Sequence, residues 1–215
     1  MASTYLADRN ALFLHLPKTA GFSISSALAA IPGARPLPVR GMRRVRGAAR
    51  YTAAQLGARV FAETWSFAVV RDPWDWAVSG WKHVTENTKA YPEERPDFEE
   101  FLRGGWRRGL RQNPNPMKFR SPEAFVRYHC LVTQWEHLSL GFGRLAPLAY
   151  TARFETLSDD LRVIERRLGV ELAVPHKNRS ERAPYHAYYD AALREIVARA
   201  NAPLIRRFGY AFDGG

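Results

Sequence analysis

The stretch ALFLHLPKTAGFSISSAL, residues 11–28, decides how the fold of this chain is interpreted. Residues 12–16 form a short apolar run of strand length that ends at Pro17, and residues 18–21 are a turn of small residues with one lysine. Apolar side chains then recur at roughly helical spacing at Phe22, Ile24, Leu28 and Ile31. The pattern predicts a buried strand, a tight turn and a helix.

This predicted turn is suited to an anion, because a helix start directs backbone N–H groups and a positive dipole end at it. Lys18 adds a point charge, and Thr19 and Ser23 add hydroxyl donors. The common nucleotide loop, GxxxxGK[ST], does not occur in the sequence, and in this turn the lysine, Lys18, precedes the glycine, Gly21. We interpret the stretch as a phosphate-binding loop, with a surface connection that binds no ligand as the alternative.

The composition of the 215 residues indicates a globular chain, which we expect to form one domain with a small insertion. A net charge of +11 suits an anionic ligand, an anionic polymer or a membrane surface, although the basic residues are scattered outside residues 40–50. The single cysteine, Cys130, and the spacing of the six histidines argue against a disulfide or a metal centre. No signal peptide or membrane-spanning segment is recognisable, so we expect a cytoplasmic protein.

The remaining pattern alternates strands and helices. Residues 67–70 are a second buried strand, and Asp72 and Pro73 are typical of the cap and first residue of a helix. We expect a third strand at residues 148–154 and a basic loop at 32–50. Helices are predicted at residues 52–61, 122–138, 157–168 and 193–204. The fold class is therefore α/β, a single domain with a central, mainly parallel sheet flanked by helices.

A second anion signal follows the second strand. Arg71 stands at the carboxyl end of that strand, where ligands of open α/β sheets bind, and Ser79 lies two helical turns further on. A guanidinium there can grip a phosphate through two hydrogen bonds, and a serine can add a third. The alternative is a surface ion pair of Arg71 with Asp72 or Asp75.

Together, HLPKTAGFSI (15–24) and RDPWDWAVSGW (71–81) resemble two motifs of the sulfotransferase superfamily. The first is similar to its HIPKTGGTS-type 5′-phosphosulfate loop, and the second to its 3′-phosphate motif, RxPxxRxxSxY. The order of FEEFL, RFETLSDDL, PHKNRS, PYHAYYD and FGYAF is similar to the carbohydrate-type branch. The resemblance covers nearly the whole chain, with residues 87–148 the least similar.

This resemblance implies a P-loop-like fold that binds 3′-phosphoadenosine 5′-phosphosulfate (PAPS) and transfers its sulfuryl group to a hydroxyl. The acceptor would be a carbohydrate, a glycoconjugate or a small metabolite, and no metal or nucleic acid would be needed. Residues 87–122 are rich in Pro, Gly, Arg and Glu, and from this composition we expect them to form an insertion or lid on the acceptor side. Lys18 would contact the 5′-phosphate and the bridging oxygen and stabilise the leaving group. The other residues implied in binding PAPS, or its product PAP, are Pro17, Thr19, Ala20, Gly21, Phe22, Ser23, Ile24, Arg71, Ser79, Lys177 and Arg179.

Three departures from the family pattern affect these expectations. Phe22 replaces the usual Thr or Ser, which removes a side-chain donor but keeps the backbone N–H. Trp76 replaces an arginine of the 3′-phosphate motif, leaving less charge or an aromatic wall. Residues 22–70 also contain no histidine, although related enzymes often have one there as the base.

The acceptor hydroxyl must lose its proton as it attacks, so a histidine or a carboxylate near the sulfur is expected. His83, one turn beyond Ser79, and Glu63, just before the second strand, are the candidate catalytic bases. Tyr51 is a remote candidate. We expect a structural or phosphate-adjacent role for His15. Two further histidines are candidates for lining the acceptor side, His129 and His137.

Rival interpretations remain open at this level. A nucleotide kinase is disfavoured by the absent GK[ST]. A nucleic-acid or polyanion-binding module is supported only by the net charge. A protein that binds PAP without turnover is compatible with the missing histidine. The acceptor, the base and the oligomeric state are not determined by the sequence.

Overall fold

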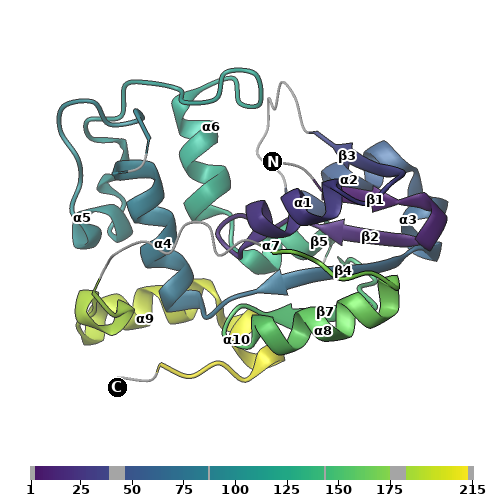
Figure 1. Cartoon of the computed structure of the whole chain (residues 1–215). Helices are drawn as coiled ribbons and strands as arrows, with labels where there is room; N and C mark the ends of the chain where they lie inside the picture. The colour runs from purple at the N-terminus through teal and green to yellow at the C-terminus, as the bar shows by residue number, and fades with distance from the viewer. Residues whose placement is uncertain (1–2, 39–46, 87, 143, 175–182, 213–215) are drawn as a thin grey trace. The chain divides into compact units, whose positions relative to one another are not determined.

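The computed structural model shows an α/β chain in which the described residues form two compact units (Figure 1). It describes residues 3–38, 47–86, 88–142, 144–174 and 183–212. The first unit contains residues 3–38, 47–71, 137–142 and 144–174, and the second contains residues 72–86, 88–136 and 183–212. Of the segment expected as an insertion, 87–122, the described residues 88–122 belong to the second unit.

The first unit is built on a five-stranded sheet with the order β3-β1-β2-β4-β7 (Figure 1). The strands are β1 (Ser3–Leu6), β2 (Ala11–Leu14), β3 (Ala34–Leu37), β4 (Trp65–Val70) and β7 (Tyr150–Arg153). β4 is parallel to both β2 and β7, whereas β1 is antiparallel to both β2 and β3. The sheet is therefore mixed, and the prediction of a mainly parallel sheet holds only for β2, β4 and β7.

Two strands of this sheet that the sequence did not predict, β1 and β3, explain this difference. β1 is a four-residue strand, joined to β2 by a short 3₁₀ turn (η1, Ala7–Arg9). β3 is an edge strand of the sheet, and the missing N–H of Pro36 is tolerated in such a strand. The segment predicted as a basic loop, 32–50, thus contains a strand, and its residues 39–46 lie outside the described part of the chain.

The core of the first unit covers one face of this sheet. Phe13, Phe67 and Val69 point from the strands toward that face. α1 (Gly21–Ala29) contributes Ile24 and Leu28 to the core. α8 (Leu157–Leu168) contributes Ile164 and Leu168, and it ends at the left-handed Gly169, as predicted.

The remaining elements of the first unit include the predicted helix 52–61, which is in fact two helices. These are α2 (Ala48–Leu56) and α3 (Ala58–Glu63), and they part at Gly57, whose φ is +84°. The Thr52 hydroxyl of α2 bonds the Ser3 hydroxyl of β1 at 2.9 Å. A two-stranded ribbon is formed by β5 (Ser139–Gly141) and β6 (Arg144–Leu145).

The second unit is helical. α4 (Pro73–Thr85) begins after Asp72, as predicted, and packs Val78 against Phe98 and Leu193. Its other helices are α5 (Phe98–Leu102), η2 (Gly105–Arg107), α6 (Pro122–Val126), the π-helical η3 (Arg127–Leu131), η4 (Tyr185–Tyr188), α9 (Ala191–Ala200) and α10 (Ala202–Phe208).

Two predicted helices are interrupted in the structure. In the segment 122–138, α6 runs directly into η3, and α7 (Gln134–Leu138) follows after a break. The break occurs because Val132, between η3 and α7, leaves helical geometry with a ψ of 109°. The last predicted helix is interrupted at Asn201, between α9 and α10. Among the described helices, none has both the length and the apolar character needed to cross a bilayer.

Candidate functional site: the Lys18 loop and Arg71

Two non-glycine residues in the loop between β2 and α1 have left-handed backbone conformations. Lys18 has a φ of 64° and Ala20 a φ of 60°, and Ala20 is the residue that caps α1. Each such residue costs roughly 1–2 kcal/mol, and strain of this kind is concentrated at functional sites. The turn is thus held in a specific shape by its surroundings.

Buried contacts provide that hold. The Thr19 side chain is fully buried, and its hydroxyl donates to the Leu16 carbonyl at 3.1 Å. The backbone N–H of His15 donates to the Ser3 hydroxyl at 3.2 Å. The His15 ring lies against Gly21, where a Cβ would overlap it. Thr19 and His15 therefore shape the loop, and this fits the structural role expected of His15. The Thr19 hydroxyl proton, however, is donated to a carbonyl of the chain itself.

The start of α1 has no internal cap. Ala20 provides no side-chain hydrogen bond, and the first helical bond runs from the Ile24 N–H to the Ala20 carbonyl at 3.2 Å. Among the described residues, no acceptor bonds the N–H groups of Gly21, Phe22 or Ser23. These donors and the positive end of the helix dipole are what an anion requires.

Arg71 lies directly beside this loop. β2 and β4 are parallel with Leu14 opposite Ala68, so the loop after β2 and Arg71 after β4 meet at the same sheet edge. The Arg71 guanidinium donates to the Lys18 carbonyl at 3.1 Å. It also lies 4.0 Å from the centre of the Phe154 ring. The structure thus brings Lys18 and Arg71 together.

Phe154 is a residue that the sequence reasoning missed. Its N–H donates to the Val70 carbonyl at 2.8 Å, which places its ring under the guanidinium at the end of β7. Arg71 is only 8% exposed in this setting. In the motif RFETLSDDL, the sequence signal for this contact is the position of the phenylalanine at the end of the predicted strand 148–154.

The start of α4 differs from that of α1. Asp72 accepts the N–H groups of Trp74 and Asp75 at 2.8 and 2.9 Å, and Pro73 has no N–H to satisfy. This helix start is therefore capped by the chain itself. Trp76, which replaces the family's arginine, is 2% exposed and is a core side chain.

The other residues predicted to bind PAPS differ in their exposure and in the unit to which they belong. Phe22 is 44% exposed, whereas Pro17, Ser23 and Ile24 are buried in or beside the loop. Ser79 lies in α4 and therefore in the second unit. Lys177 and Arg179 lie outside the described residues.

Glu63 is not brought to the loop. It ends α3 just before β4, and its carbonyl accepts the Asn10 side-chain N–H just before β2. Arg71 follows the other end of the six-residue β4, roughly 20 Å away at strand spacing. The Glu63 carboxylate pairs with Arg59 at 2.9 Å. Glu63 is therefore at the wrong sheet edge to act as the base.

The histidine candidates lie in different surroundings. His83 is half-buried in α4, and its ring centre is 5.2 Å from that of His129. His137 is fully buried, and its Nδ1 accepts the Ala48 N–H at 3.2 Å, which is a structural contact within the first unit. Tyr51 lies half-buried in α2.

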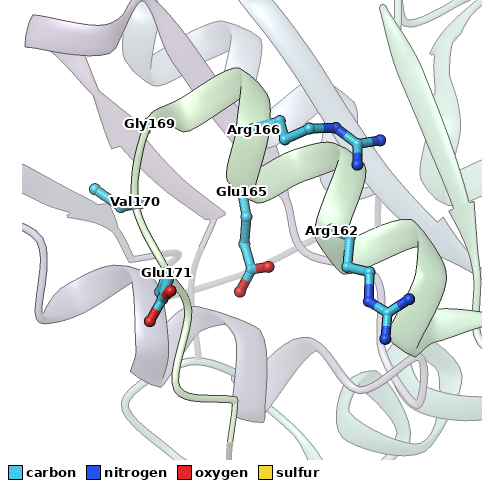
Figure 2. Close-up of a pocket in the computed structure, with 6 residues that line it drawn as sticks. All are labelled: Arg162, Glu165, Arg166, Gly169, Val170 and Glu171. Carbon is cyan, nitrogen blue, oxygen red and sulfur yellow. The ribbon is translucent and has the colours of Figure 1, made fainter.

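An open surface pocket of about 510 Å³ lies elsewhere in the first unit (Figure 2). It is lined by Arg162, Glu165, Arg166, Gly169, Val170 and Glu171. The Arg9 guanidinium, just before β2, donates to the Leu168 carbonyl next to this pocket. The pocket thus lies at the sheet edge opposite the Lys18 loop and shares no residue with it.

Comparisons with protein-family models, curated proteins and solved structures gave no match to this chain. Within the described residues, no group of three or more His, Cys, Asp or Glu side chains could hold a metal ion.

Proposed function

We propose that this protein is a PAPS-dependent sulfotransferase that sulfates a hydroxyl of a carbohydrate, a glycoconjugate or a small metabolite. The observation that carries the proposal is the uncapped, strained Lys18 loop beside Arg71 at one edge of the sheet. The resemblance of the two segments to the 5′-phosphosulfate and 3′-phosphate motifs suggests PAPS as the ligand and sulfuryl transfer as the reaction.

The loop's donors match the 5′ end of the donor. In sulfuryl transfer, the acceptor oxygen bonds to sulfur while the bond between sulfur and the bridging oxygen breaks. Negative charge then accumulates on the 5′-phosphate of the departing PAP. The N–H groups of Gly21, Phe22 and Ser23 and the Lys18 ammonium would neutralise that charge, as preorganised donors do in phosphoryl transfer.

Arg71 matches the other end of the same nucleotide. A guanidinium carries five N–H donors in a fixed fork, which suits the bidentate binding of a phosphate. The contacts with the Lys18 carbonyl and the Phe154 ring set its orientation. Arg71 would hold the 3′-phosphate, the group that distinguishes PAP from AMP. Ser79 is the proposed second contact, from sequence alone.

The proton of the acceptor hydroxyl needs a base, for which His83 is our leading candidate and Tyr51 a remote one. The acceptor itself is best found by incubating labelled PAPS with sugars, glycoconjugates, lipids and phenols. Transfer of label to an acceptor of one class would identify that class.

Ligand binding tests the proposal without knowledge of the acceptor. Thermal unfolding should be measured with PAP, AMP, ATP and duplex DNA, because a ligand that binds the folded state raises the midpoint. We expect PAP to bind at least about tenfold more tightly than AMP, which lacks only the 3′-phosphate. Equal stabilisation by AMP and PAP would rule out a 3′-phosphate site.

A matched pair of variants tests whether Arg71 is responsible for the preference for PAP over AMP. Arg71→Lys keeps the charge but removes the planar fork, so it should reduce the preference for PAP over AMP. Arg59→Lys makes the same change at an exposed position on the opposite sheet edge and should leave the preference intact. An unchanged preference in Arg71→Lys would place the 3′-phosphate elsewhere.

A further inference from the structure

Lys118 is a cation buried in the helical second unit. Its side chain is 9% exposed and lies over two aromatic rings, with Nζ 4.1 Å from the ring centre of Tyr128 and 5.1 Å from that of Phe119. The negative faces of these rings attract the ammonium but offer no full counter-charge.

No acidic partner faces this cation in the part of the chain that the structure describes. Among the described residues, its Nζ takes part in no ion pair and no hydrogen bond. The carboxylate of Glu123, in α6, is held by Ser121 and feels the charge of Arg107. Burial alone lowers the pKa of Lys118 to about 8. An ammonium in such a place is destabilising unless an anion complements it.

The surroundings of Lys118 contain further nitrogen donors. Tyr128 belongs to the π-helical η3, a type of turn that is frequent at functional sites. The next residue, His129, has its ring centre 5.3 Å from that of Tyr128 and 5.2 Å from that of His83. The Phe125 carbonyl can only accept, so the His129 Nδ1 at 2.8 Å carries a proton.

We propose that Lys118 is the centre of a binding site for an oxyanion group of a small ligand, with the rings of Phe119 and Tyr128 as its wall. A carboxylate, a phosphate ester and a sulfate ester share this chemistry. The inference stands on the second unit alone and does not depend on the proposed sulfotransferase function.

Anion titrations test this site. The unfolding midpoint should be followed with sulfate, phosphate and acetate, with sodium chloride keeping the ionic strength constant. The proteins are the wild type, Lys118→Met and Lys89→Met, the last removing an exposed lysine of the same unit. Any contribution of the Lys18 loop is common to all three proteins.

We expect at least one anion to stabilise the wild type and Lys89→Met with the same half-saturation, and Lys118→Met to need at least about ten times more of it. The anion with the largest effect identifies the kind of oxyanion. If Lys118→Met and the wild type respond identically to all three anions, the proposal is wrong.

A labelling experiment on the wild type covers the case in which Lys118→Met does not fold. Acetic anhydride acetylates uncharged amines, and mass spectrometry can quantify modification at each lysine. Saturating anion should slow acetylation of Lys118 severalfold and leave Lys89 unaffected. Equal rates at Lys118 with and without each anion would overturn the proposal.

Discussion

Two helices of this protein follow parallel strands, and their first turns are finished in opposite ways. α1 follows β2 and has no side-chain cap, a left-handed Ala20 and open N–H groups. α4 follows β4 and is closed by the Asp72 carboxylate and Pro73. From the sequence, the same strand-turn-helix pattern predicts an anion site at both connections.

The difference shows that a strand-to-helix connection is not by itself an anion site. What matters is whether the chain satisfies its own N–H groups. Around β4, the cation Arg71 precedes the helix and belongs to the first unit, whereas the capped first turn belongs to the second. Of these two helix starts, only that of α1, beside the Lys18 loop, leaves its first N–H groups without an acceptor among the described residues.

The largest expected effect concerns Lys18, the charge at the open helix start. Lys18→Met removes the ammonium but keeps the length of the side chain. If the ammonium stabilises the departing phosphate, the rate of PAP formation from PAPS with a screened acceptor should fall at least about 100-fold. Circular dichroism and the unfolding midpoint should show an intact fold. Turnover within tenfold of the wild type would contradict this role.

The next expected effect concerns a buried cation. Arg71 has a carbonyl partner, whereas Lys118 has no hydrogen-bond or ion-pair partner among the described residues. Burial depresses the pKa of Lys118 from 10.5 to about 8. Below pH 8 both folded and unfolded chains hold the proton, and the full cost of burying the charge, about 3 kcal/mol, is present. Between about pH 8 and 10.5 only the unfolded chain keeps the proton, so stability rises with pH.

Urea unfolding of the wild type and Lys118→Met in chloride buffer at several pH values measures this contribution. The stability advantage of Lys118→Met should shrink by about 3 kcal/mol from pH 7 to pH 10.5. The neighbouring titratable groups, Tyr128, His129 and His83, are present in both proteins and cancel in the difference to first order. A difference that stays constant over this range would show that the folded lysine is not depressed.

Removing the cap of α4 should have a smaller effect. Asp72→Ala leaves the Trp74 and Asp75 N–H groups without their acceptor and should cost about 1 kcal/mol of unfolding free energy. Asp72→Asn keeps a capping oxygen and should cost clearly less. Equal losses in the two variants would point to the charge of Asp72 instead of its cap.

The smallest effect has the opposite sign. Ala20→Gly removes the steric cost of a φ of 60° and should stabilise the protein by up to about 1 kcal/mol. Ala27→Gly, in the middle of α1, is the matched control and should destabilise by roughly 0.5–1 kcal/mol. Destabilisation in both variants would mean that the Ala20 backbone is not strained.

The parts of the fold that could be predicted from sequence are those written in local patterns. The buried runs of β2 and β4, the cap and proline of α4, and the end of α8 at Gly169 depend on near neighbours in the chain. The meeting of Lys18 and Arg71 follows from two such strands lying parallel. Their binding of a nucleotide remains a prediction.

The parts that could not be predicted depend on distant contacts. β1 and β3 are strands because they pair with each other and with β2, and the polar residues of β3 conceal this. Glu63 is near Arg71 along the chain, but the six residues of β4 separate them in space. No local pattern marks Lys118 as buried, since its aromatic wall is completed by Tyr128 of η3.

The order of the sheet has a consequence for how the chain acquires its structure. Tyr150 pairs with Phe67 about 80 residues earlier, and the intervening chain includes most of the second unit. Closing so long a loop is slow, and until β7 arrives β4 is an apolar edge strand open to other chains. Refolding yield should therefore fall as protein concentration rises, with self-association competing at the β4 edge.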